Sequence, residues 1–70
     1  MPPPTHFTFY LYLKDGSIRR ATRRWKCSLR EAHLMVLRKA MKNGSEVLRL
    51  ETCYRDNLGK LRAMVSDYRT

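Results

Sequence analysis

The chain has 70 residues, of which 15 are Lys or Arg and 6 are Asp or Glu, which gives a formal net charge of +9. A chain this short has room for one thin hydrophobic core and not for two domains. No stretch approaches the ~20 apolar residues of a membrane span, and the N-terminus lacks the apolar run of a secretory signal. We therefore expect a cytoplasmic protein with a flexible Pro-rich lead-in over residues 1–5 and a single domain over residues 6–70.

The first predicted element is a β-strand followed by a tight turn. Apolar residues alternate with Thr and Tyr from Phe7 to Leu13, and a period of two is typical of a strand. Asp15-Gly16 then favours a two-residue type I′ turn, in which both central residues need positive φ. We therefore expect a β-hairpin in which Leu13 lies opposite Ile18.

The faces of the second strand are ambiguous. The two-residue turn pairs Leu11 with Arg20, so it directs Arg20 toward the core and Arg19 and Arg23 toward the other face. A β-bulge near Arg19 and Arg20 would instead turn Ala21 inward, and bulges are frequent at sheet edges. Both arrangements remain open at this point.

A capped helix follows the hairpin. Ser28-Leu29-Arg30-Glu31 is a capping box, in which the Ser28 hydroxyl accepts the Glu31 N–H. At 100° per residue, an apolar stripe centred on Val36 lies on one side of the next turns, and His33 falls on the same side. Asn43-Gly44 ends the helix, because Gly suits the left-handed conformation that follows a last helical turn.

A second hairpin completes the chain. Residues 46–55 alternate like a strand, Asp56 to Gly59 form a turn, and Lys60 to about Tyr68 alternate again. The predicted fold is therefore α+β with the order ββαββ. A four-stranded antiparallel sheet with the single helix packed on one face is the simplest way to bury these stripes.

Catalysis is poorly supported by the sequence. His33 has no cooperating group near it in the chain and is expected to be a hydrogen-bonded core residue. Cys27 and Cys53 lack metal-ligand spacing, and we expect both to be reduced, with a single bridge as the alternative. Cys27 precedes a helix among cations, which would lower its pKa, although an apolar role next to the helix cap is favoured. We expect no enzymatic activity, no metal and no cofactor.

The strongest functional signal is a run of basic residues around Trp25. Arginine binds phosphate and carboxylate through two parallel hydrogen bonds and stacks on flat groups, so this run predicts a binding surface. Solubility alone is the other interpretation, and Trp25 is either a core anchor or a surface for stacking bases. Met35 would add an apolar centre with a basic rim on the exposed side of the helix. The candidate partner-binding residues are Arg19, Arg23, Arg24, Lys26, Arg30, Met35, Arg38 and Lys42.

Two short segments carry a resemblance to a known family. Ser28-Leu29-x-x-Ala32 at the helix start, followed by Val47-Leu48-Arg49-Leu50-Glu51-Thr52, resembles one group of small phage anti-CRISPR proteins over residues 27–66. These are ββαββ inhibitors of type I interference complexes. The resemblance implies docking on Cas backbone subunits, with basic helical residues as contacts. Arg38 matches one such position, whereas two neighbouring basic positions are His33 and Leu34 here.

A non-enzymatic binding function is therefore expected. The leading hypothesis is a phage or mobile-element inhibitor that acts in the host bacterium, docks through a basic surface on a type I CRISPR-Cas complex and blocks recognition of target DNA. The alternative is a small accessory module that contacts DNA or RNA phosphates without sequence specificity. A homodimer formed by pairing of edge strands is a third hypothesis.

Overall fold

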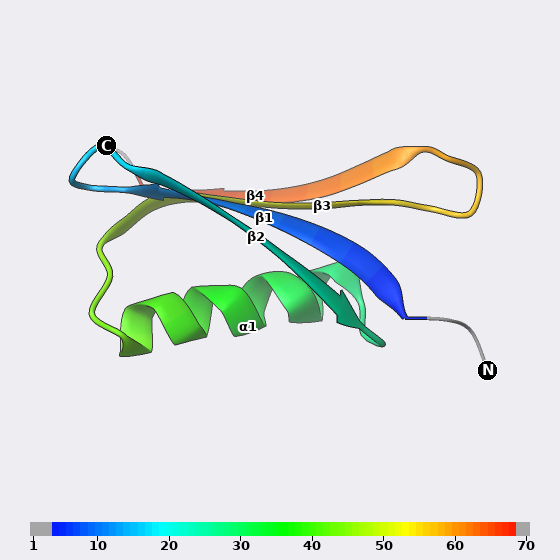
Figure 1. Cartoon of the computed structure of the whole chain (residues 1–70), viewed down its shortest axis with the longest axis horizontal. Helices are drawn as coiled ribbons and strands as arrows, with labels where there is room; N and C mark the ends of the chain where they lie inside the picture. The colour runs from blue at the N-terminus through cyan, green and yellow to red at the C-terminus, as the bar shows by residue number, and fades with distance from the viewer. Residues whose placement is uncertain (1–3, 69–70) are drawn as a thin grey trace.

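The computed structural model describes residues 4–68, which form two layers, a sheet and one helix (Figure 1). The elements follow in the order β1 (Thr5–Leu13), β2 (Ile18–Trp25), α1 (Leu29–Lys42), β3 (Val47–Arg55) and β4 (Leu61–Asp67). All neighbouring strands are antiparallel, in the spatial order β2-β1-β3-β4. The predicted ββαββ fold is thereby confirmed.

The strand β1 begins at Thr5, the last residue of the predicted lead-in, and residues 1–3 lie outside the described part of the chain. Because β2 and β4 are the edges of the sheet, any strand pairing between copies would use one of them. Within the described residues, α1 is too short and too polar to span a bilayer.

The hydrophobic core lies between the sheet and α1. We call the sheet face toward α1 the helix side and the opposite face the open side. Alternation along β1 brings every second residue to the helix side, which is why its apolar residues are buried there. The buried apolar residues are Phe7, Phe9, Leu13, Ala32, Leu37 and Leu50.

Both ends of α1 follow local signals in the sequence. The Ser28 hydroxyl oxygen accepts the Glu31 N–H at 3.2 Å, and the Glu31 carboxylate lies 3.2 Å from the same hydroxyl. At the other end, Gly44 has a φ of +79°, and the Ser45 N–H donates to the Ala40 carbonyl at 3.0 Å. This is the Schellman arrangement, which satisfies carbonyls that the last turn leaves free.

The turn between β1 and β2 differs from the predicted type I′ turn. The Gly16 N–H donates to the Leu13 carbonyl at 3.0 Å, and the Leu13 N–H donates to the Ser17 carbonyl at 2.9 Å. In this turn Gly16 alone has positive φ, at +91°. The loop is therefore a type I turn closed by a left-handed glycine, with one residue more than predicted. The Asp15 carboxylate stabilises this loop by accepting hydrogen bonds from both the N–H and the hydroxyl of Ser17.

That additional loop residue reverses the two faces of β2. Leu11 lies opposite Arg19 and Phe9 opposite Ala21, so Arg19 and Ala21 are on the helix side. The assignment of Arg19 and Arg23 to the open side was wrong. Ala21 does turn inward, as the bulge alternative predicted, but the ladder of β1 with β2 runs evenly from Thr5 to Tyr12 and the loop causes the change.

A buried histidine joins the helix to both strands of the second hairpin. His33 Nδ1 lies 2.8 Å from the Thr52 hydroxyl and Nε2 lies 2.8 Å from the Ser66 hydroxyl. His33 is 1% exposed, which confirms that it is a hydrogen-bonded core residue. Since Ser66 must face the helix to make this contact, the alternating apolar residues of β4 face the open side, where Leu61 is 56% and Val65 47% exposed.

Candidate binding groove

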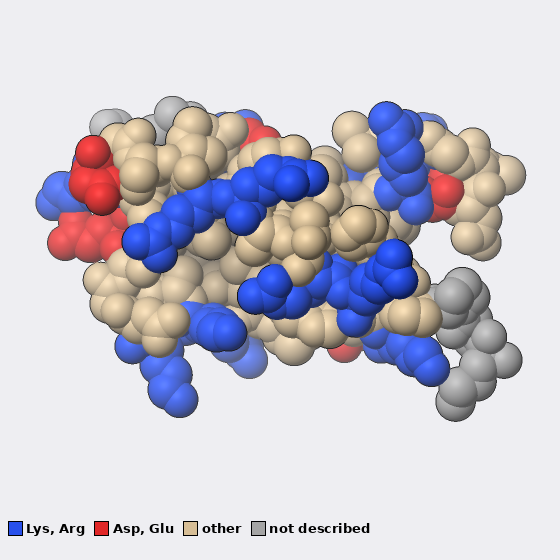
Figure 2. All heavy atoms as spheres, in the orientation of Figure 1, with Lys and Arg blue, Asp and Glu red and all other residues tan. Residues whose placement is uncertain are grey.

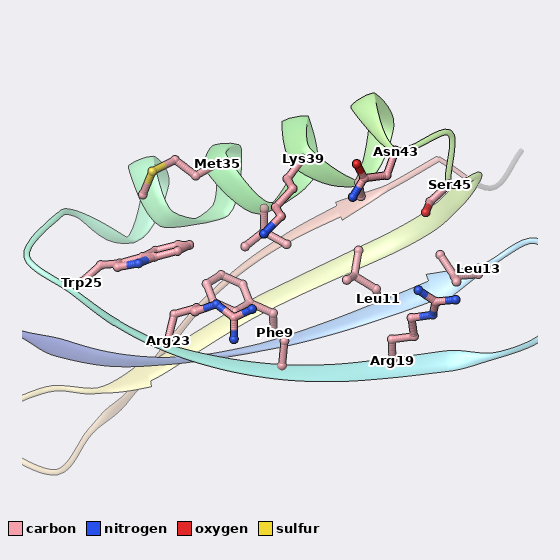
Figure 3. A pocket seen from close by; sticks show the side chains of 13 residues that line it. Phe9, Leu11, Leu13, Arg19, Arg23, Trp25, Met35, Lys39, Asn43 and Ser45 are labelled. Atoms are coloured by element: carbon pink, nitrogen blue, oxygen red, sulfur yellow. The ribbon is translucent and has the colours of Figure 1, made fainter.

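A groove runs between α1 and the helix side of β2, and we call it the β2–α1 groove (Figure 3). It exists because α1 packs mainly on β3 and leaves the helix side of β2 largely uncovered. Its volume is about 260 Å³, and its lining residues are Phe9, Leu11, Leu13, Arg19, Ala21, Arg23, Trp25, Met35, Val36, Lys39, Ala40, Asn43 and Ser45.

The floor of the groove is apolar and continuous with the core. Phe9 is fully buried beneath it, and the Trp25 ring lies 5.7 Å from the Phe9 ring, centroid to centroid. Ala21 and Val36 are partly buried and pack against the same core. Trp25 is therefore a partly buried anchor of the core, and its remaining surface lines the groove.

The rim of the groove is cationic. Arg19 and Arg23 extend from β2, and Lys39 extends from α1 on the other side (Figure 3). Among the residues that line the groove, none carries a carboxylate. One Arg23 guanidinium nitrogen donates to the Thr22 carbonyl at 2.6 Å, which leaves its remaining N–H groups for other acceptors. The groove is therefore an apolar channel in a positive electrostatic field.

Of the candidate residues, the structure brings Arg19, Arg23 and Met35 together at the groove. Arg24 lies opposite His6 and therefore on the open side of the sheet. The other candidates are exposed but do not line the groove, namely Lys26, Arg30, Arg38 and Lys42. The basic run is thus divided between two faces of the sheet.

Lys39 is a groove residue that the sequence reasoning did not select. It follows Met35 by four positions and Asn43 follows it by four more, so the three side chains lie in one row along α1. That spacing was visible in the sequence. What the sequence did not show was that β2 would carry Arg19 and Arg23 opposite this row.

Most carboxylates of the described residues are engaged away from the groove. Their ion pairs join Lys14 to Glu46, Arg49 to Glu51 and Asp67, and Arg62 to Asp56. Among the charged side chains visible in Figure 2, most are Lys and Arg, and the acidic ones are seen mainly toward the ends of the molecule. Within residues 4–68, none of the β2 arginines forms an ion pair with a carboxylate.

Two titratable groups near the core, His33 and Cys27, have shifted pKa values. Burial lowers the pKa of His33, so the ring is neutral at physiological pH, and both nitrogens are occupied by hydroxyls. Burial raises the pKa of the Cys27 thiol, and Glu31 raises it further, so the expected lowering by nearby cations was wrong. Cys27 and Cys53 are both free thiols. Over residues 4–68, no group of three His, Cys, Asp or Glu side chains is placed to hold a metal ion.

Comparison with known proteins identifies no relative. No family model matches the chain, and neither a curated protein nor a solved structure gives a significant match.

Proposed function

We propose that the chain is a non-enzymatic binding protein of phage or mobile-element origin that docks on a type I CRISPR-Cas complex. It blocks recognition of target DNA in the cytoplasm of the bacterial host by occupying a surface, without any chemical step. The resemblance over residues 27–66 suggests this target, and the ββαββ fold is the one that the resemblance implies.

The observation that carries the proposal is the combination of an apolar floor with a cationic rim in the β2–α1 groove. Protein interfaces have an apolar core surrounded by a polar rim, whereas contacts with nucleic acid are dominated by phosphates. A phosphate backbone would satisfy Arg19 and Arg23 but would leave the surface around Trp25 and Val36 without an apolar partner. A protein surface that combines apolar side chains with carboxylates satisfies both the floor and the rim.

His33 restricts how the family contacts carry over to this chain. It occupies one of the basic helical positions of the family, but it is 1% exposed and cannot reach a partner. Arg38 is exposed and retains its position. We therefore expect the contact surface to be shifted from that of the family toward β2.

The test is capture of a purified type I complex by two double variants with the same change in charge. Arg19→Glu with Arg23→Glu reverses the helix-side arginines, and Arg20→Glu with Arg24→Glu reverses their neighbours on the open side. We expect the first pair to abolish capture and the second to weaken it only slightly. Absence of capture by the wild-type protein, or equal loss in the two pairs, would contradict the proposal.

A second candidate function is nucleic-acid binding on the open side of the sheet. Arg20 lies opposite Tyr10 there, and Arg24 lies on the same face, so cations and an aromatic ring share one surface as in proteins that bind single strands. Contact with about four phosphates predicts a log–log salt slope of roughly −3.6 on duplex DNA. Tight binding of free DNA at about 0.15 M salt, lost in the Arg20 and Arg24 variant, would favour this candidate over the first.

A further inference from the structure

The sheet is wider than the single helix that covers it. An α-helix with its side chains is about 10–12 Å across, and strands lie about 4.8 Å apart, so one helix covers roughly two strands. In this chain α1 packs mainly on β3, with fewer contacts to β1 and β4. The helix side of β2 is therefore left largely uncovered by α1, and it is accessible to one face of a second helix.

We propose that the β2–α1 groove binds one amphipathic helix of a partner protein, with apolar residues toward the floor and acidic residues along both edges. This inference rests on the proposed function in that it names the element of the partner that this surface recognises. In this type of recognition an amphipathic helix lies in a groove, and its apolar residues, which recur every three or four positions, contact the floor.

The shape of the groove favours a helix over a small molecule. Its volume of about 260 Å³ is too small to enclose a drug-sized ligand, for which about 300–1,000 Å³ is usual, whereas a helix needs to insert only one face. It extends along α1 from Met35 to Asn43, which spans roughly 12 Å or about two helical turns. The small side chains of Ala21 and Ala40 line it, and small residues allow another helix to approach to about 8–10 Å.

Charge decides which helix fits. The charged side chains that line the groove are Arg19, Arg23 and Lys39, two from the strand and one from the helix. A helix between them places one row of carboxylates toward β2 and another toward α1. A second copy of the chain is a poor occupant, since each copy carries a net charge of +9 and the copies repel each other.

The first experiment uses designed peptides and the fluorescence of Trp25, the only tryptophan of the chain, which lines the groove. The probe is a helical peptide of about 14 residues with leucine at every third or fourth position and glutamate on both flanks. One control peptide has the same composition in scrambled order, and another has lysine in place of glutamate. We expect only the probe to shift the Trp25 emission in a saturable manner. Equal binding of the probe and the scrambled peptide would overturn the inference.

Variants then locate the bound peptide. Arg19→Glu with Arg23→Glu should weaken binding at least about tenfold, because each lost contact is replaced by repulsion, whereas Arg20→Glu with Arg24→Glu should change it less than about threefold. Met35→Glu places a carboxylate at the groove from a side chain that is 43% exposed, so it should weaken binding without unfolding the domain. Circular dichroism checks that each variant is folded. Binding that survives Met35→Glu and the Arg19 and Arg23 reversal would place the peptide elsewhere.

Capture of the CRISPR-Cas complex separates the two proposals. If the probe binds and competes with that complex for the protein, both stand. If the probe binds but the complex is not captured, the groove inference stands and the proposed function fails. If the complex is captured and an excess of the probe neither binds nor competes, the proposed function stands and the groove inference fails.

Discussion

The buried His33 should make the stability of this domain depend on pH in a window where few other groups titrate. Burial lowers the pKa of the folded-state ring below its ordinary value of 6.5. As the pH falls below about 6.5, the unfolded chain binds a proton at His33 more readily than the folded chain does, so stability is lost. Above that pH the ring is neutral in both states and its contribution is constant.

The magnitude follows from the linkage relation and the local structure. One group whose pKa is lowered on folding changes the free energy of unfolding by at most about 1.4 kcal/mol per pH unit. The pKa values of Asp15 and Asp56 are lowered from 3.8 by hydrogen bonds, so the stability that they contribute is lost only at lower pH. The free energy of unfolding of a 70-residue domain is roughly 4–10 kcal/mol in total. A loss of this size over one pH unit is therefore measurable.

The assay is urea unfolding followed by the fluorescence of Trp25 between about pH 5 and pH 7.5. His33→Gln should remove most of the slope below about pH 6.5 while lowering stability at neutral pH. Thr52→Val should cost about 1–3 kcal/mol at neutral pH, because it leaves a buried ring nitrogen without its partner at 2.8 Å. A wild-type slope near zero from pH 6.5 to 5.5, or the same slope in His33→Gln, would refute the reasoning.

Three further predictions concern single positions. Ala32→Asp should unfold the domain, since the site is 0% exposed and a carboxylate there has no partner, whereas Met35→Asp should leave the circular dichroism spectrum unchanged because Met35 is 43% exposed; the reverse result would mean that the helix faces are misassigned. Gly16→Ala should destabilise by about 1–2 kcal/mol in thermal unfolding, because φ is +91° and the added methyl meets no atom within 4 Å, so strain is the only cost; an unchanged melting temperature would contradict the turn geometry. Cys27 should react with iodoacetamide more slowly than the thiol of a small unstructured peptide at neutral pH, because its raised pKa keeps it protonated. Faster alkylation would show that the nearby cations lower its pKa instead.

Local patterns in the sequence determined the elements and their ends. The alternation from Phe7 to Leu13, the capping box at Ser28 and the glycine at Gly44 each act through neighbouring residues, so they predicted β1 and α1 without knowledge of the rest. The apolar face of α1 was predicted for the same reason, and it carries Ala32 and Leu37, which the structure shows to be buried.

The tertiary structure decided which faces of β2 and β4 point toward the helix. Side chains in a strand alternate, so a turn longer by one residue reverses every assignment in the next strand. The loop ending at Gly16 has that effect on Arg19 and Arg23. In β4, Ser66 is on the helix side, where its hydroxyl contacts His33, 33 positions away in the chain. The β2–α1 groove therefore could not be read from the sequence, because its two sides are brought together only by the register of the sheet and the position of α1.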